Sequence, residues 1–517
     1  MDSPSSGRKS VIVDAEDELK FPLQNHLRNE HHLEITKDGK FVRWYRENPK
    51  HPRNWSTSRK IYDVGLVCLL DLIITASSTA GAAAAKAAEQ DYHVTPTYAT
   101  FCFVTLFLLS QAVGSIIFPP WSESFGRKYT YIFCSALSCI CCLVIGVVES
   151  NSAAITMRII AGFLASIPAT VVGGSIEDMF NSQDRIWVMF FWTVASNIGM
   201  IIGPIMSSHL IELLNWRWVF YVYAIALGIT TGALWFIRES RSSLLLTREV
   251  NILRNEILSL PPALSHDHSM DFATFTKEAL FRPAQFFFRE PIIFVTAIMI
   301  SVSNSIIFIF TEALQPIYQN LGFSAAQASL IFMAIGLGVC FSTLTRILDT
   351  HIFNKKRRQG LTTKPEDKLL GLIIGSPALA IGLWWFAWTI PPILKSANIP
   401  WIVPTMSLVL VGYALTEIDT LMYGYIADSY LTYSASATAA VAFLRGVLCG
   451  TFPLFTNQMF HWMGANIAVS VLASVATVFC AVLPLFMCYG ERIRRRSRFA
   501  NHSWEIQKEI GNDDDDL

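Results

Sequence analysis

Long apolar runs alternate with short polar connections along most of this chain. Three of the clearest runs occupy residues 61–85, 101–120 and 292–310, and each is almost continuously apolar. An α-helix needs about 20 apolar residues to cross the hydrocarbon core of a bilayer, whereas the buried helices of soluble proteins are usually shorter. The runs therefore predict helices that span a membrane.

Run length and helix-breaking residues predict about twelve spans, in two groups of six. The expected spans of the first group lie at 60–83, 98–120, 129–149, 153–176, 186–210 and 216–237. Those of the second group lie at 289–312, 325–348, 369–390, 399–424, 436–459 and 463–488. The pattern predicts an all-α polytopic membrane protein built from two halves.

A polar segment rich in Arg, Glu and Ser separates the two groups of spans. The predicted domain organisation is an N-terminal tail at 1–59, a six-helix half at 60–237, a linker at 238–288, a second six-helix half at 289–489 and a C-terminal tail at 490–517. Such a pair of halves is one known basis for transport by alternating access.

Basic residues collect in the connections on one side of the predicted spans. That side carries Arg127 and Lys128, the basic run 355–358 and the arginines of 492–498, whereas the opposite connections hold few cations. Because basic connections stay on the cytoplasmic side of a membrane, we expect both termini and the linker to be cytoplasmic. The first 59 residues contain no apolar core, so a cleaved signal peptide is not expected.

The composition narrows the class of function. Hydrophobic residues make up 52% and charged residues 15% of the chain, and the formal net charge of +0 gives no general attraction to nucleic acid. All ten cysteines fall inside the apolar runs, where helix packing explains them. No Walker A loop and no His-Glu-x-x-His pattern occurs, and His31 and His32 of the polar tail are expected to be solvated. The sequence predicts no metal, no cofactor and no enzymatic activity.

A few ionisable residues lie deep within the predicted spans, where a charge is costly unless it faces a cavity or a partner. These candidates for proton coupling or for the lining of a cavity are Asp71, Arg158, Glu312, Glu417, Asp419 and Arg445. Asp71 is the first choice as proton carrier, because burial favours the neutral form of a carboxylic acid; a position at a helix end is the alternative. Glu417 and Asp419 are two residues apart, about 200° around a helix, so both cannot face one cavity.

The connection after the second predicted span contains Ser122-Glu123-x-x-Gly126-Arg127. Gly126 permits a tight turn, and the Glu123 carboxylate can form a charge relay with the basic pair that follows. This loop resembles the connection between the second and third helices of the major facilitator superfamily, in particular the Ser-Glu-x-x-Gly-Arg pattern of its fungal drug:proton antiporter branch. The family's leading glycine is Pro119 here. A basic loop that only sets topology is the alternative interpretation.

Further motifs repeat the resemblance in chain order. They are the segment 48–56, Arg158 with Gly162, Gly173-Gly174 with Asp178, Gly199-x-x-x-Gly203-Pro204, and the segments 215–220, 289–292, 427–430, 452–455 and 497–500. We expect Glu123, Gly126, Arg127 and Asp178 to take part in gating. The resemblance implies that Arg158 lines the central cavity and takes part in proton handling; an arginine bonded to backbone carbonyls, or one that reaches outward, is the alternative.

Gly199 and Gly203 are four residues apart, so they share one helix face and permit close contact with another helix. Pro204 removes a backbone hydrogen bond and bends the helix. The pattern resembles the antiporter signature of the family, and we expect a conformational pivot there. The family's terminal Gly-Gly is Ser207-Ser208 here, and simple packing of small residues is the alternative.

These observations predict the major facilitator fold and the proton-coupled export of a small organic compound, such as a drug, toxin or secondary metabolite, by alternating access. An uptake carrier, a polyamine exporter and a non-transporting nutrient sensor are the alternatives. The expected partners are protons, the substrate and the lipid bilayer, with no nucleic acid and a monomeric state. The expected location is the plasma membrane, with the vacuolar membrane as the alternative. The sequence does not identify the substrate.

Overall fold

The computed structural model describes most of the 517-residue chain. The described residues are 26–36, 40–45, 47–255, 257, 260–263, 282–359, 371–391, 393, 399–430, 434–497 and 499.

Twelve helices in the described residues are long and apolar enough to cross a membrane. The first six spans are α2 (Thr57–Tyr92), the continuous helix of α3 (Pro96–Thr100), η2 (Phe101–Thr105) and α4 (Leu106–Phe125), α5 (Arg127–Val147), α6 (Asn151–Met179), α7 (Ser182–Leu213) and α8 (Trp216–Leu234). The other six are α12 (Pro291–Gln319), α13 (Ala325–Ser329) with α14 (Phe332–Arg358), α15 (Leu372–Thr389), α17 (Ile402–Tyr430), α18 (Ser434–Met463) and α19 (Ala465–Arg496). The predicted all-α polytopic fold is confirmed.

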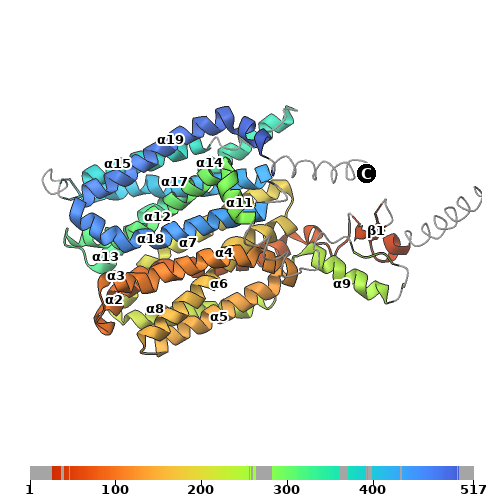
Figure 1. The fold of residues 1–517 in the computed structure, drawn as a ribbon, viewed down its shortest axis with the longest axis horizontal. Helices are drawn as coiled ribbons and strands as arrows, with labels where there is room; N and C mark the ends of the chain where they lie inside the picture. Colours follow the sequence, from red (N-terminus) through yellow and green to blue (C-terminus); the bar gives the residue numbers. More distant parts are fainter. Residues whose placement is uncertain are drawn as a thin grey trace, which may run out of the picture.

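The two groups of helices lie side by side as two bundles, drawn in warm and cool colours in Figure 1. Within the first bundle α2 packs on α7, α4 on α6, and α5 on α8; within the second, α12 packs on α18, and α15 on α17 and α19. The bundles meet mainly where α4 contacts α18 and where α7 contacts α14.

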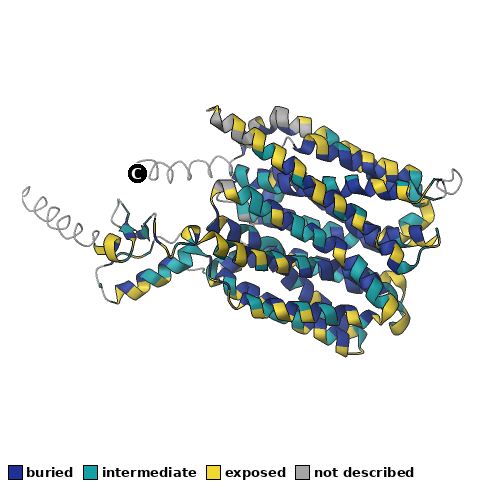
Figure 2. Ribbon diagram, turned by 180° about the vertical axis from the view of Figure 1, so that it is seen from behind, coloured by how far each residue is buried: buried dark blue, intermediate teal, exposed yellow. Residues whose placement is uncertain are grey.

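The outer faces of the bundles expose large apolar side chains. Phe133, Ile140 and Val147 follow one another at seven-residue intervals along α5 and are each more than half exposed, at 57%, 53% and 63%. Ile225 and Ile229, four residues apart on α8, are also more than half exposed, at 60% and 71%. Figure 2 shows buried residues between the helices and exposed residues along their outward sides. An apolar stripe on the outside of a bundle that is also apolar inside fits a lipid environment.

Helix α2 is longer than the predicted span at 60–83. It continues to Tyr92 and ends at His93, which adopts a left-handed conformation with φ 50°. The added turns contain Ala84, Ala85 and Ala88, which are buried. Alanine is the best helix former. Hydropathy alone therefore underestimates the length of a helix that continues through alanines and a few polar residues.

A small folded unit lies beyond one end of the two bundles (Figure 1). Strand β1 (Leu33–Ile35) pairs antiparallel with β2 (Val42–Trp44), with Leu33 opposite Trp44 and Ile35 opposite Val42. The hairpin and the helical residues 26–30 pack on α9 (Ser242–Arg254) through a second, separate hydrophobic core. The short helices η1 (Pro52–Asn54) and α11 (Arg282–Arg289) lead into α2 and α12. We call the end of the bundles beside α9 the linker end, and the other end the opposite end.

Candidate functional site

A cavity lies between the two bundles and holds about 480 Å³ of empty space, its mouth included. Helices α2, α4, α6 and α7 contribute to its lining from the first bundle, and α12 and α18 from the second. Its polar lining includes Gln111, Asn304 and Arg445, and its apolar lining includes Ile74 and Phe308. A concave site between the two bundles that combines apolar side chains with a few polar groups is typical of small-molecule binding.

Arg445 of α18 is the centre of a charged group at this cavity. Its positive charge acts on two carboxylates, Asp71 of α2 and Asp419 of α17. Asp71 is 1% exposed and Asp419 is 3% exposed. Because a buried carboxylate needs partners, the two hydrogen bonds that these side chains accept are important. The indole Nε1 of Trp192 donates to Asp71 at 2.9 Å, and the amide Nδ2 of Asn304 donates to Asp419 at 2.8 Å.

The structure therefore brings together three of the six predicted membrane charges. Asp71 comes from the first bundle, and Asp419 and Arg445 come from the second. Trp192 and Asn304 were not identified from the sequence, because a search for charges within spans does not find neutral hydrogen-bond donors. We call Asp71, Arg445 and Asp419 the central charge group.

Glu417 points to a different environment, as its two-residue offset from Asp419 requires. Its carboxylate is completely buried and lies 3.7 Å from Nη2 of Arg346 in α14, whose Nη1 lies 3.8 Å from Asp349. The Arg346 guanidinium also lies over the ring of Phe190 in α7, 5.5 Å from its centroid. Among the described residues neither oxygen of Glu417 has a hydrogen-bond partner. The charged groups of this cluster lie 3.7–3.8 Å apart, and the contact of Arg346 with Phe190 connects the two bundles near the linker end.

Arg158 lies apart from both charge clusters. Its Nε donates to the carbonyl of Phe103 at 2.9 Å, its Nη2 donates to the same carbonyl, and its Nη1 donates to the carbonyl of Ser77 at 3.3 Å. The guanidinium also lies 4.4 Å from the ring centroid of Phe107. Within the described residues the cavity lining does not include Arg158. The structure thus places this arginine on backbone carbonyls, which was the alternative interpretation.

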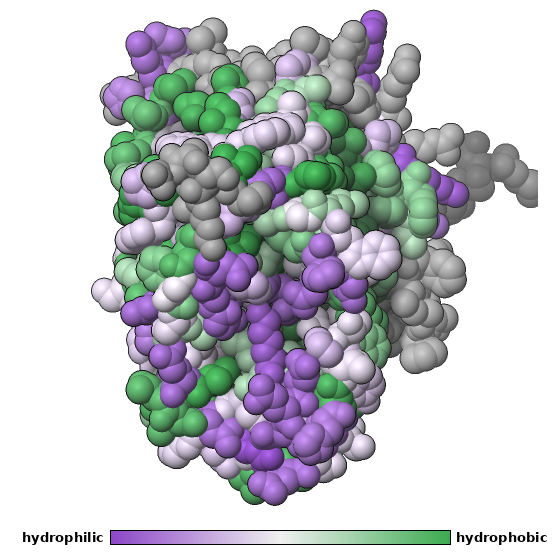
Figure 3. Space-filling view, turned by 90° about the vertical axis from the view of Figure 1, so that its left-hand side faces the viewer, coloured by the Kyte–Doolittle hydropathy of each residue, from purple (hydrophilic) through white to green (hydrophobic). Residues whose placement is uncertain are grey.

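Glu312 lies at the opposite end, where polar contacts join the bundles. Its side chain is completely buried, and the charge of Lys86 in α2 acts on it. Nζ of Lys86 donates to Oε1 of Gln315 at 3.2 Å, and Glu212 of α7 accepts the backbone N–H of Ala326 at 3.0 Å. Figure 3 views this end and shows hydrophilic residues gathered mainly in its lower half, with more apolar residues above them. These contacts tie α2 and α7 to the second bundle.

The loop between α4 and α5 forms a tightly bonded cluster at the linker end. Gly126 has a φ of 94°, and a Cβ there would lie 2.6 Å from the Glu239 carboxylate, so only glycine fits. Nε of Arg127 donates to Asp178 at 2.6 Å. The backbone N–H groups of Arg127 and Lys128 donate to Glu239 at 2.9 Å and 3.1 Å.

This cluster unites Gly126, Arg127 and Asp178, three of the four residues expected to take part in gating around this loop and the end of the fourth span. The fourth, Glu123, is half-buried in the last turn of α4, and its charge acts on Arg127. Glu239 was missed, although an acidic residue directly after a predicted span and within a basic segment is a visible signal. Its carboxylate satisfies N–H groups at the start of α5 that have no partner within that helix.

Gly199 and Gly203 lie where α7 packs against α2. A Cβ on Gly199 would be 2.5 Å from the carbonyl oxygen of Leu72, and one on Gly203 would overlap Thr79 and the carbonyl of Ala76. Pro204 lies within α7. The contact is therefore between backbones, as the four-residue spacing predicts, and larger side chains would force the helices apart.

A family model described as the Major Facilitator Superfamily matches residues 67–453. The chain belongs to the major facilitator superfamily. It is therefore a multi-pass membrane transporter and not an enzyme, and its curated relatives fit this assignment.

Several fungal transporters of the superfamily are similar to this chain along most of its length. It is 28% identical to a protein of Candida glabrata named multidrug transporter TPO1_2, covering 93% of this chain and 82% of that protein. It is 28% identical to the efflux pump radE of Floropilus chiversii, covering 88% and 84%. It is 30% identical to the MFS-type transporter hepF of Aspergillus oryzae, covering 90% and 96%.

Solved structures of the superfamily share the fold. The proton:xylose symporter XylE bound to 6-bromo-6-deoxy-D-glucose superposes with a TM-score of 0.60 at 14% sequence identity, covering 84% of this chain and 97% of that chain. At this low sequence identity, the similarity establishes a shared arrangement of the helices and nothing more.

Proposed function

We propose that this superfamily member exports a small organic compound from the cytoplasm in exchange for protons, by alternating access. The observation that carries the proposal is the central charge group, in which Asp71 of one bundle and Asp419 of the other share Arg445 at the cavity. The names of similar fungal proteins, a multidrug transporter and an efflux pump, support the export of organic compounds.

The net charge of the central charge group in its different protonation states supports the exchange of cargo for protons. With both carboxylates ionised, the group carries one net negative charge; one proton neutralises it, and a second leaves it positive. Net charge is unfavourable at membrane depth, so the ionised group favours either a proton or a cationic or hydrogen-bond-donating cargo. Proton and cargo then exclude one another, which is the requirement for antiport. An anionic cargo would instead bind best to the protonated group and would be co-transported.

The two ends of the bundles supply the gates of this proposal. At the opposite end, Lys86 with Gln315 and Glu212 with Ala326 hold the bundles together. At the linker end, Arg346 lies over Phe190 across the bundles. Opening one end while the other stays closed would expose the cavity to each side of the membrane in turn. The close α2–α7 contact at Gly199 and Gly203 keeps the first bundle together while it moves.

The basic connections support the orientation in this proposal. The linker end, with α9 and these connections, faces the cytoplasm. The proposal also includes a monomeric transporter in the plasma membrane. The residue boundaries 60–237 and 289–489 delimit the two halves that move relative to each other.

Transport by the purified protein in liposomes tests the direction of coupling. The test compounds are a lipophilic organic cation, a polyamine and an aromatic carboxylate, each offered to vesicles with an acidic lumen. Antiport predicts accumulation of the cation or the polyamine, and abolition of that accumulation by a protonophore. Accumulation only in vesicles with an alkaline lumen would show that cargo and protons move together, and would refute export by exchange.

Two variants connect the result to the central charge group. Asp71→Asn is expected to abolish accumulation driven by the pH gradient, because asparagine cannot carry the proton. Glu149→Gln is the matched control, since the Glu149 side chain is 82% exposed and lies outside the cavity. Unchanged gradient-driven transport in Asp71→Asn would exclude Asp71 as a proton carrier.

A further inference from the structure

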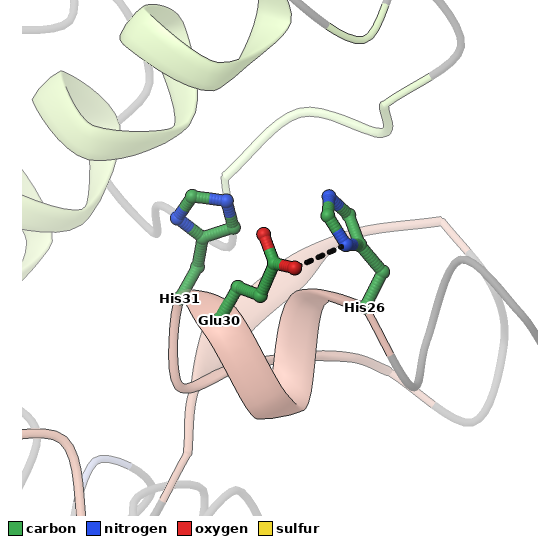
Figure 4. Close-up of side chains that lie close together, drawn as sticks. All are labelled: His26, Glu30 and His31. Carbon is green, nitrogen blue, oxygen red and sulfur yellow. Dashed lines mark ion pairs between the residues drawn. The ribbon is translucent and has the colours of Figure 1, made fainter.

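Three side chains of types that can bind a metal ion lie close together in the small folded unit at the linker end (Figure 4). His26 and Glu30 are one helical turn apart, and His31 follows directly after this turn. Nδ1 of His26 lies 3.5 Å from Oε1 of Glu30. One ligand atom from each of His26, Glu30 and His31 lies within 4.8 Å of the others. Two imidazole nitrogens and a carboxylate oxygen are a donor set that Zn²⁺ and similar ions prefer.

The backbone that carries this cluster is held in place by the rest of the unit. Leu27, between the ligands, is 0% exposed and belongs to the hydrophobic core shared with α9. The amide of Asn48 donates to the carbonyl of His31 at 3.2 Å and to that of His32 at 2.9 Å. The backbone N–H of His31 donates to the carbonyl of Leu27 at 3.1 Å. The ligands therefore project from a fixed turn, and binding needs only side-chain rotation.

The local charge also favours a cation. Arg28 is the basic residue within the turn, and it is directed onto Tyr45, with Nη2 2.6 Å from the hydroxyl and the guanidinium 4.6 Å from the ring centroid. Its guanidinium is thus engaged with Tyr45. Glu30 supplies the negative charge that partly neutralises a divalent ion.

We propose that His26, Glu30 and His31 bind a divalent transition-metal ion, with Zn²⁺ as the favoured ion. Bonds of about 2.0–2.2 Å bring tetrahedral ligand atoms to about 3.3 Å from one another, which is close to the 3.5 Å already present between His26 and Glu30. Water completes the coordination, because the cluster is exposed at His26 and Glu30. The bound ion joins the helical turn to the residue that leads into β1, and so stabilises the small folded unit. The site is independent of the proposed transport function.

Metal titration of the tag-free, full-length protein in detergent tests this site. After treatment with a chelator, Co²⁺ is added and its visible absorption is followed, and Zn²⁺ is then added as competitor. We expect one ion per chain, displaced by Zn²⁺. His26→Ala and Glu30→Gln each remove a ligand, so each should weaken binding by more than the roughly tenfold loss that follows removal of an outer partner. His461→Ala, which changes an exposed histidine elsewhere, should bind as the wild type does.

Hydrogen exchange separates loss of a ligand from loss of the fold. Zn²⁺ should slow amide exchange in residues 27–35 of the wild type, because binding to the folded state alone stabilises it. Glu30→Gln should keep the metal-free exchange pattern and lose the effect of Zn²⁺. Absence of saturable binding, or binding that survives both ligand variants unchanged, would overturn the proposal.

Discussion

Replacing the two carboxylates of the central charge group, singly and together, gives a quantitative test of their shared partner. In Asp71→Asn the charge of Arg445 remains balanced by Asp419, and asparagine can still accept the hydrogen bond from Trp192. The hydrogen bond from Trp192 then has a neutral acceptor in place of a charged one, which lowers the free energy of unfolding by about 1 kcal/mol. The same reasoning gives about 1 kcal/mol for Asp419→Asn, whose amide partner is Asn304.

The double variant leaves Arg445 without a balancing carboxylate in this group. A buried charge that loses its balancing groups costs up to about 3–5 kcal/mol. Arg445 acts on both carboxylates through its charge and lines a cavity with a mouth, so we expect a value near the lower limit. The double variant should therefore lose about 3 kcal/mol, about 1 kcal/mol more than the sum of the single variants. Addition of Arg445→Gln to the double variant should recover part of this loss.

Denaturant titration in mixed micelles, followed by tryptophan fluorescence, measures these free energies. Residues that do not interact give additive effects within about 0.5 kcal/mol. If the double variant equals the sum of the single variants within that margin, Asp71 and Asp419 do not share Arg445, and the charge counting behind the proposed exchange fails.

Three further predictions concern other parts of the molecule. Gly203→Ala should destabilise the protein by about 1–3 kcal/mol in thermal unfolding, because a methyl group would overlap the backbone of α2, whereas Gly232→Ala, with open space around it, should be neutral or stabilising. Burial, and then two nearby cations, lower the pKa of His51, whose ring lies 5.8 Å from that of Trp44 in β2, to about 4, below its usual 6.5. The small folded unit should therefore keep its full stability above pH 6.5 and lose part of it as the pH falls from 6.5 to 4, as measured by hydrogen exchange. His51→Asn should remove this acid sensitivity. Glu239→Gln should lower the free energy of unfolding by about 1–2 kcal/mol, because it weakens the hydrogen bonds to the first N–H groups of α5. Glu249→Gln, which removes an ion pair with the exposed Lys50, should cost less than about 0.5 kcal/mol. Equal effects of the two variants would contradict the role of Glu239.

The spans could be predicted from the sequence because the bilayer fixes the length of an apolar helix. Each of the twelve expected spans overlaps one of the helices of the structure. Errors are confined to the ends, as in α2, where alanines extend the helix beyond the hydropathy boundary. The spacing of Gly199 and Gly203 also predicted a close helix contact, because a four-residue interval has one geometric meaning on a helix.

The central charge group could be predicted only in part. Charges at membrane depth are costly, which singled out Asp71, Asp419 and Arg445 one by one. Their meeting depends on how three helices from two bundles pack, and no local pattern encodes that. The sequence also does not distinguish Arg445, which lines the cavity, from Arg158, which bonds to backbone carbonyls, because both are arginines within apolar helices.

The small folded unit at the linker end is a second feature that could not be predicted fully from the sequence. The sequence predicted a polar tail, since its apolar residues are few and scattered among charges. Leu27, Leu33 and Val42 are nevertheless fully buried, because Leu246 and Val250 of α9 complete their core. A core assembled from two distant segments leaves only a weak signal in either one.

The number of protons released when cargo binds tests the central claim most directly. Calorimetric titrations of the purified transporter with its cargo, in buffers of different ionisation enthalpy near neutral pH, give this number. Competition for the central charge group predicts proton release in the wild type and its loss in the Asp71→Asn, Asp419→Asn double variant. Proton uptake on binding would contradict the account, because cargo and proton would then occupy the transporter together.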